Sequence, residues 1–231
     1  MKVKVEMNKT AAYEYENSIV RTNIINWYPF DDGESILVMG YTGEVVKKYL
    51  QDVLKVVDSV DTREQQKYDY VFIMEGAYRG QKFELDEVIL RKAIGYLKAK
   101  GHLLIAMSNP MGMKYWAGAA EESTGRPYVG LEGGAGKQIL SDATRVTLPI
   151  LLEKCGLVEV EFYYPFPDHI FPTAIYSDGF LPQPGDLRGQ SPTYAGNNYG
   201  MFREDRVYEK ICRDGLFPYF ANAFFIVSRI A

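Results

Sequence analysis

Apolar runs and helical stripes alternate along most of the chain. The short apolar runs, which are typical of buried strands, fall at residues 35–39, 55–58, 68–74 and 102–107. Apolar positions at helical spacing predict helices over residues 12–27, 44–54, 84–98 and 144–154. This alternation predicts an α/β protein with a mostly parallel, doubly wound sheet.

The last two predicted strands break this alternation. Residues 157–164 and 220–230 have strand patterns, and no helical pattern stands between them. Two such strands would pair antiparallel at one side of the sheet. The intervening residues 165–218 are rich in Pro, Gly and Tyr, so we expect an irregular aromatic insertion there.

Composition narrows the class of protein. The 231 residues, 47% of them hydrophobic, suit one domain over residues 1–231 with a sizeable core. The net charge of −4 argues against a nucleic-acid-binding protein, which normally has a basic face. No apolar run approaches the ~18 residues of a membrane span. With no secretory signal pattern and no metal-ligand spacing at Cys155 and Cys212, we expect a cytoplasmic protein without a metal centre.

A polar, aromatic and glycine-rich segment, residues 109–125, follows the predicted strand 102–107. In open α/β sheets, ligands bind outside the carboxyl ends of the strands. We therefore interpret this segment as a candidate binding loop. The alternative is a surface loop that is held by a buried Trp116.

Several motifs resemble those of one enzyme family. They are residues 23–28, 67–71, Asn109, Gly112, and residues 114–118, 124–125, 132–133, 163–168, 171–178 and 181–182. Over roughly residues 20 to 230, the chain resembles class I S-adenosylmethionine-dependent methyltransferases, in particular a bacterial group associated with polysaccharide-biosynthesis glycosyltransferases. The resemblance implies a Rossmann-like methyltransferase fold that ends in an antiparallel strand pair. It also implies methyl transfer to a saccharide or another small polar acceptor.

The resemblance further implies where S-adenosylmethionine would bind. The turn after the first strand would hold its amino-acid part, and acids would follow the next two strands. The residues at these places are Gly40, Thr42, Gly43, Asp58 and Glu75. Each has a plainer interpretation as well. The glycines would then form a tight turn, Asp58 would be a solvated strand end, and Glu75 would cap the next turn.

The cofactor motif is degenerate in this sequence. Val38 replaces the acid of the first strand, and Thr42 and Glu44 replace glycines that let the backbone approach the cofactor. Only residues 59–67 separate the second and third strands, which is too few for another helix and strand. We therefore expect a sheet that is shortened at this edge, and weak or absent cofactor binding.

A base would assist methyl transfer to a hydroxyl group, because it takes the proton as the bond forms. Ser123 stands where the family often has a histidine. The remaining catalytic candidates are Glu121, Glu122, Asp168 and His169. A lone histidine such as His169 is more often a surface or hydrogen-bonded residue than a catalytic one.

The candidate substrate-binding residues come from the loop after residue 107 and from the later strand pair. They are Asn109, Lys114, Tyr115, Trp116, Thr124, Arg126 and Tyr176. We expect them to line one cleft together with Glu121 and Asp168, since an aromatic wall with a few polar groups suits a saccharide. In the competing interpretation, Tyr115 and Trp116 only pack under the insertion.

Two functions remain open at this point. The first is an S-adenosylmethionine-dependent methyltransferase that acts on a saccharide or a small polar acceptor. The second is a non-catalytic methyltransferase-fold module for binding or assembly, which would pair as a homodimer. The downstream motifs favour the first function, and the degenerate turn and the shortened sheet favour the second.

Overall fold

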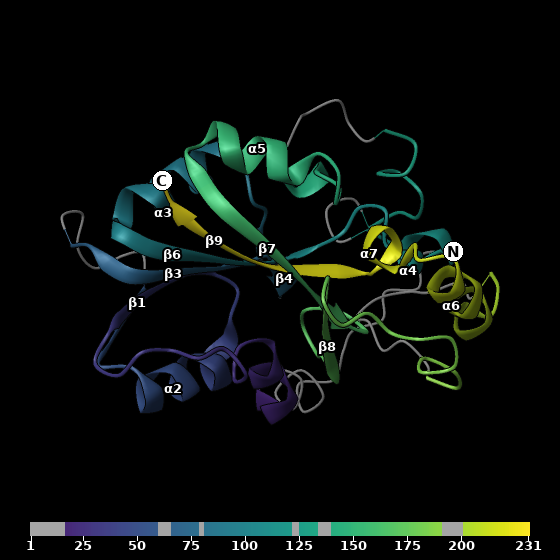
Figure 1. Ribbon diagram of the computed structural model, residues 1–231, viewed down its shortest axis with the longest axis horizontal. Helices are drawn as coiled ribbons and strands as arrows, with labels where there is room; N and C mark the ends of the chain where they lie inside the picture. Colours follow the sequence, from purple (N-terminus) through teal and green to yellow (C-terminus); the bar gives the residue numbers. More distant parts are fainter. Residues whose placement is uncertain (1–16, 60–65, 79–80, 122–124, 134–139, 191–200) are drawn as a thin grey trace.

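The computed structural model describes residues 17–59, 66–78, 81–121, 125–133, 140–190 and 201–231. Its main sheet has seven strands in the order β2-β1-β3-β6-β9-β7-β8 (Figure 1). The strands are β1 (Ser35–Gly40), β2 (Val56–Ser59), β3 (Tyr68–Met74), β6 (Leu97–Ser108), β7 (Leu157–Phe166), β8 (Ala174–Ser177) and β9 (Ala223–Ile230). A small hairpin consists of β4 (Gly76–Tyr78) and β5 (Gln81–Phe83).

The strand pairing confirms the predicted sheet. β1 pairs in parallel with both β2 and β3, and β3 pairs in parallel with β6. β9 then runs antiparallel between β6 and β7. Within the described residues, β2 is the last strand at its edge of the sheet, in agreement with the predicted shortening.

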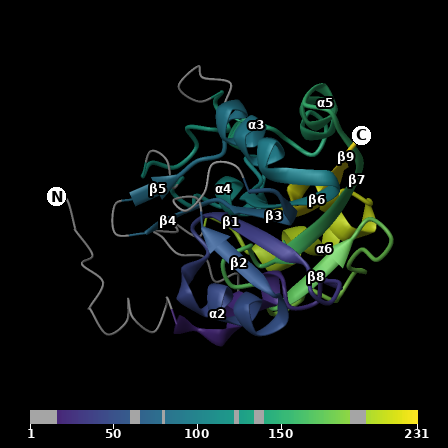
Figure 2. The same ribbon diagram turned by 90° about the vertical axis from the view of Figure 1, so that its left-hand side faces the viewer.

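Helices cover both faces of the sheet (Figures 1 and 2). The 3-10 helix η1 (Ile19–Ile24) and α2 (Gly43–Val53) lie on one face, whereas α3 (Glu87–Tyr96) and α5 (Leu148–Lys154) lie on the other. The shorter elements are α4 (Met113–Trp116), η2 (Leu140–Asp142), α6 (Glu204–Arg213) and α7 (Phe217–Phe220).

The two-residue period of a strand divides the core into two clusters. On β1, Leu37 and Met39 join the cluster under α3 and α5. Ile36 and Val38 join the cluster under η1 and α2. The sheet is therefore buried on both faces, which explains the uninterrupted apolar runs of its central strands.

Some predicted helix bounds were wrong. A helix was predicted over residues 12–27, but the structure has only the short 3-10 helix η1 in this region. Residues 12–16 lie outside the described residues. The helix predicted over residues 84–98 ends at Tyr96, because the chain continues at once into β6. The helix predicted from residue 144 begins at Leu148.

The expectation of an irregular segment at residues 165–218 was wrong in part. The segment contains β8 and α6, and α7 begins within it. β8 forms because the free edge of β7 offers backbone hydrogen bonds, a tertiary effect that local turn signals do not reveal. Helix α6 is mostly polar and buries only Glu204, Tyr208 and Ile211, so its apolar stripe is too narrow to stand out in the sequence.

No helix in the described part of the chain is long and apolar enough to cross a membrane. The described residues also contain no group of three or more His, Cys, Asp or Glu residues placed to hold a metal ion.

Candidate functional site

The turn between β1 and α2 requires glycine at two positions. Gly40 and Gly43 have φ angles of +86° and +75°, which L residues with a side chain rarely adopt. A Cβ atom at Gly40 would overlap the carbonyl oxygen of Met74 on the neighbouring strand. The same carbonyl accepts a hydrogen bond from the Tyr41 N–H at 2.8 Å, so β3 holds the turn closely.

Side chains from two other parts of the chain pack against this turn. The ring of Phe83, at the end of β5, lies 2.7 Å from the position that a Cβ at Gly40 would take. The Arg21 guanidinium lies 3.3 Å from the corresponding position at Gly43. It also donates to the Thr42 carbonyl at 3.3 Å and lies 5.0 Å from the centre of the Tyr41 ring. Arg21 is fully buried in this position.

This packing does not fit the amino-acid part of S-adenosylmethionine. Glycines in such turns serve to let a ligand approach the backbone. Here Phe83 and Arg21 occupy the space beside the two glycines. At the end of β2, the half-buried Asp58 carboxylate accepts a hydrogen bond from the Tyr68 hydroxyl at 2.8 Å, so one of its oxygens is already engaged.

Glu75 begins a network of buried polar groups at the carboxyl ends of β3 and β6. Its carboxylate accepts hydrogen bonds from the Ser108 N–H at 3.1 Å and from the Ser141 hydroxyl. Lys114 continues the network, because its Nζ donates to Ser108 Oγ at 3.2 Å. Glu75 and Lys114 are both nearly inaccessible to solvent.

Asp168 and His169 approach this network from the end of β7. One carboxylate oxygen of Asp168 accepts from the N–H groups of Ile170 and Phe171, at 2.8 and 2.9 Å. Burial raises the pKa of Asp168, and the positive charges of Lys114 and Arg21 oppose this rise. His169 Nε2 lies 3.0 Å from the Glu75 carbonyl oxygen.

The environment of His169 makes it a poor base. Complete burial, helped by the charge of Lys114, lowers its pKa from 6.5 to about 3. The neutral ring therefore donates from Nε2 to the Glu75 carbonyl. The buried Nδ1 has no hydrogen-bond partner in the described part of the protein. Because efficient proton transfer needs a pKa near the working pH, His169 is better suited to a structural or orienting role.

The other acid candidates lie elsewhere. The Glu121 carboxylate accepts a hydrogen bond from the Gly130 N–H. Burial raises the pKa of Glu121, and the negative charge of Asp142 adds to the rise. Glu122 lies outside the described residues.

The predicted substrate-binding residues fall into separate environments. Lys114 and Tyr115 stay together, with the ammonium 4.9 Å from the ring centre. Asn109 is buried and donates to the carbonyls of Tyr219 and Ala221 at 2.9 and 2.7 Å. It thereby links the loop after β6 to the end of α7. Tyr176 packs in the apolar core, 5.5 Å from the Phe217 ring centre.

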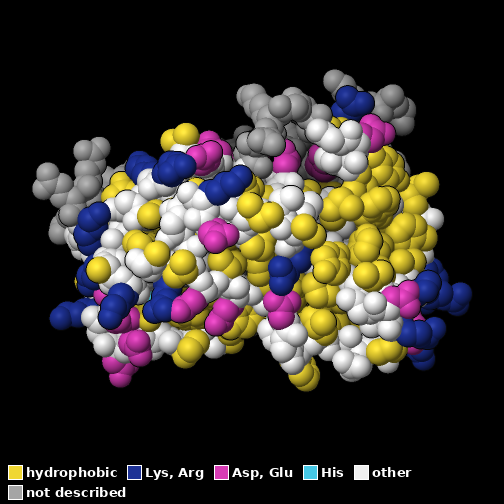
Figure 3. Space-filling model, turned by 45° about the horizontal axis from the view of Figure 1, so that its top comes forward, with side chains coloured by type: hydrophobic (Ala, Val, Ile, Leu, Met, Phe, Trp, Pro, Cys, Tyr) yellow, Lys and Arg dark blue, Asp and Glu magenta, His cyan; other side chains and the backbone are white. Residues whose placement is uncertain are grey.

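Trp116 and Arg126 face solvent. The Trp116 side chain is 42% exposed, and its indole N–H donates to the Met111 carbonyl at 3.2 Å. Hydrophobic side chains gather on the part of the surface over α4 and α7 (Figure 3), where Trp116, Leu216 and Tyr219 are exposed. Arg126 is exposed on the segment whose backbone pairs with Glu121, and Thr124 lies outside the described residues.

The structure thus brings Glu75, Lys114, Asp168 and His169 together and places Tyr176 and Glu121 in other environments. Sequence reasoning missed Arg21 and Phe83, which fill the turn. It also missed Asn222, whose Oδ1 accepts from the Lys114 N–H at 2.8 Å. An arginine within a helical pattern normally indicates an exposed face, so the sequence carried no signal for the burial of Arg21.

No protein-family model matches the chain, and no curated protein sequence matches it. Solved structures do match. One is phosphoethanolamine N-methyltransferase 2 from Haemonchus contortus in complex with S-adenosyl-L-methionine, with a TM-score of 0.50 and 14% identity. That match covers 98% of this chain and 58% of the other, so this chain spans a little over half the length of that enzyme.

A second similar structure is a SAM-dependent methyltransferase from Archaeoglobus fulgidus. It has a TM-score of 0.49 and 13% identity, and the match covers 96% of this chain and 100% of the other. At such identities, similarity concerns the fold alone. Together with the strand order, the first of these matches shows that the chain has the Rossmann-like fold of S-adenosylmethionine-dependent methyltransferases.

Proposed function

We propose that this protein is a non-catalytic binding module with a methyltransferase fold, in which the chain's own side chains stand where a cofactor would lie. One observation carries the proposal. Phe83 packs against Gly40 at the turn after β1, which is the place where the resemblance puts the amino-acid part of S-adenosylmethionine. Binding of the cofactor would require this ring to move.

The groups available for proton transfer support the same proposal. His169 has a pKa of about 3 and is neutral in the physiological range. The Asp168 carboxylate holds the turn at Ile170 and Phe171 through two backbone hydrogen bonds. Neither group is set up to take a proton from an acceptor hydroxyl.

The second candidate function is an S-adenosylmethionine-dependent methyltransferase that acts on a saccharide or a small polar acceptor. The network of Glu75, Lys114, Asp168 and His169 favours it, because buried charges at the carboxyl end of a sheet are often functional. The S-adenosyl-L-methionine in the similar Haemonchus contortus structure favours it as well.

Isothermal titration calorimetry with S-adenosylmethionine and S-adenosylhomocysteine separates the two functions. We expect no measurable heat, or a Kd in the millimolar range. A micromolar Kd for either compound would overturn the non-catalytic proposal and favour the methyltransferase.

The remaining features of the proposal are a single domain over residues 1–231, a cytoplasmic location and a homodimer. The two cysteines, Cys155 and Cys212, are both free thiols in the structure, which is compatible with a reducing compartment. Sedimentation equilibrium tests the homodimer, and a monomeric mass at micromolar concentration would contradict it.

A further inference from the structure

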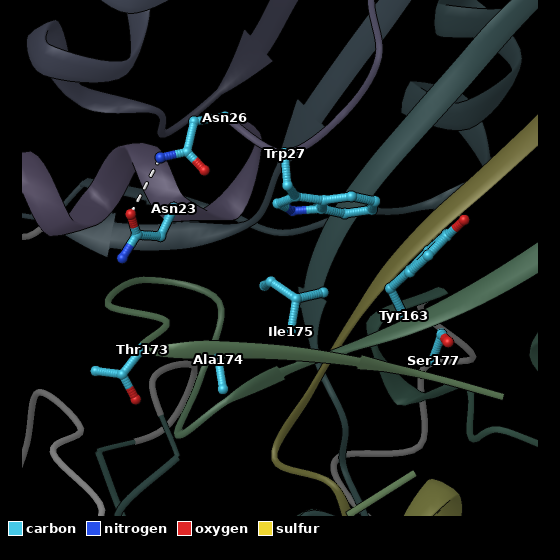
Figure 4. Close-up of a pocket in the computed structure, with 8 residues that line it drawn as sticks. All are labelled: Asn23, Asn26, Trp27, Tyr163, Thr173, Ala174, Ile175 and Ser177. Atoms are coloured by element: carbon cyan, nitrogen blue, oxygen red, sulfur yellow. Dashed lines mark hydrogen bonds between the residues drawn. The ribbon is translucent and has the colours of Figure 1, made fainter. Parts of the chain in front are cut away.

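A pocket of about 460 Å³ lies between η1 and the β7–β8 edge of the sheet (Figure 4). Asn23, Asn26 and Trp27 line it from the η1 side. Tyr163 of β7 and Ser177 of β8 line the opposite side, where they are direct cross-strand partners. The volume falls within the range of about 300–1,000 Å³ that is typical of small-molecule sites.

Two aromatic rings, one from each side, lie close together at one end of this pocket (Figure 4). The ring centres of Trp27 and Tyr163 are 4.6 Å apart, and Phe225 supports Trp27 from the core at 5.3 Å. The polar ends of both rings are already engaged. The indole N–H donates to the Ile24 carbonyl at 3.1 Å, and the Tyr163 hydroxyl donates to Glu161 at 2.9 Å. The rings therefore offer mainly their apolar faces to a ligand.

Neutral hydrogen-bonding groups surround these rings. The Asn26 amide donates to Asn23 Oδ1 at 3.1 Å, and Asn23 donates to the Pro172 carbonyl at 2.9 Å. These bonds fix both carboxamides and leave the Asn26 Oδ1 without a hydrogen bond to the described residues. The Ser177 hydroxyl likewise has no hydrogen bond within the described part of the chain. Among the described residues, the lining contains no charged side chain.

We propose that this pocket binds a neutral saccharide. A pyranose ring has an apolar C–H face, which packs well on an aromatic ring, and a rim of hydroxyls that both donate and accept. Carboxamides and a serine hydroxyl can do both as well. A phosphate, a carboxylate or an ammonium ligand would find no charge partner in this lining, and its desolvation would be costly.

This pocket is separate from the place where a cofactor would bind. None of the described residues that line the pocket belongs to the turn after β1 or to the network around Glu75. The pocket would serve a binding module, and it would equally serve a methyltransferase that holds a saccharide. A negative result for S-adenosylmethionine therefore leaves the saccharide proposal standing, and the reverse also holds.

The test begins with the full chain on an array of neutral and anionic oligosaccharides. The best neutral glycan is then titrated by calorimetry into the wild type and the variants Asn26→Ala, Ser177→Ala and Trp27→Phe. These mild changes keep the fold intact, which thermal melting verifies. We expect each variant to weaken binding about tenfold, which corresponds to about 1.4 kcal/mol.

Tyr219→Ala is the matched control, since Tyr219 is a half-exposed aromatic residue of α7 outside the pocket. It should bind the glycan as the wild type does. The proposal is overturned if no neutral glycan binds, if only anionic glycans bind, or if all three folded pocket variants keep the wild-type affinity.

Discussion

The ring of Phe83 lies against Gly40, at the turn between β1 and α2. Phe83 ends strand β5 of the small hairpin, and Gly40 ends strand β1 of the main sheet. Because Gly40 has no Cβ, an aromatic ring from the same chain can rest there, in a position that suits a ligand in other proteins with such a turn. This contact sets the first prediction.

Phe83→Ala should strengthen the binding of S-adenosylmethionine, since it removes the ring that fills the turn. We expect Kd to fall about tenfold, a change of about 1.4 kcal/mol, in calorimetric titrations at a temperature well below Tm. Phe180→Ala removes an exposed aromatic residue at a distant loop and should leave Kd as in the wild type.

The double variant Thr42→Gly with Glu44→Gly tests whether the altered turn sequence or the Phe83 ring does more to weaken S-adenosylmethionine binding. It restores the glycines of the family turn but leaves Phe83 in place. We expect no gain in affinity from these two changes alone and a gain when Phe83→Ala is added. A strong gain from the double variant by itself would show that the ring is no obstacle.

Gly40→Ala should destabilise the protein by about 2–5 kcal/mol, from the left-handed φ and from overlap with Met74 together. Gly33→Ala is the matched control, because Gly33 has a similar φ of +83° but nothing within 4 Å of its Cβ position. It should cost only about 1–2 kcal/mol. Urea unfolding followed by circular dichroism gives both values, and equal losses would mean that the contact with β3 is unimportant.

Asn222→Ala should destabilise the protein by about 3 kcal/mol, because buried partners lose their hydrogen bonds. The Asn222 side chain accepts from the Lys114 N–H at 2.8 Å and donates to the Pro167 carbonyl at 2.9 Å. It thereby ties the loop after β6 to the end of β7. The same urea experiment measures the loss, and a change below about 0.5 kcal/mol, which is typical of surface positions, would refute this role.

Stability should fall as the pH drops from 6.5 towards 3, in part because of His169. Its pKa is about 3 in the folded protein and near 6.5 in the unfolded chain, so in this window the unfolded state binds the extra proton. Stability from this group is present above pH 6.5 and declines by about 1.4 kcal/mol per pH unit as the pH falls.

The check is the free energy of unfolding between pH 3 and pH 7 for the wild type and for two variants. His169→Gln removes the titrating group while keeping a donor for the Glu75 carbonyl, so its slope should be flatter. Ser228→Ala removes a buried polar group that does not titrate and should keep the wild-type slope. The same slope in His169→Gln as in the wild type would contradict the buried, neutral state of His169.

The sequence by itself determined six of the seven strands of the main sheet, all but β8. The apolar runs of β1, β3 and β6 are buried on both faces, and a doubly wound sheet is the arrangement that buries such runs. The short connection at residues 59–67 likewise left no room for another helix and strand. Apolar runs and connection lengths are local features, so neighbouring residues in the sequence are enough to reveal them.

Only the tertiary structure decided which side chains meet. Arg21 and Phe83 are 62 positions apart in the numbering, yet both pack on the turn after β1. Tyr176 was predicted beside Asp168, but it follows the strand alternation of β8 into the core. Sequence patterns assign residues to strands and loops. The space at the ends of a sheet is filled by side chains from segments that are distant along the chain. Close packing requires only that some side chain fills this space, so the neighbouring sequence does not show which one it is.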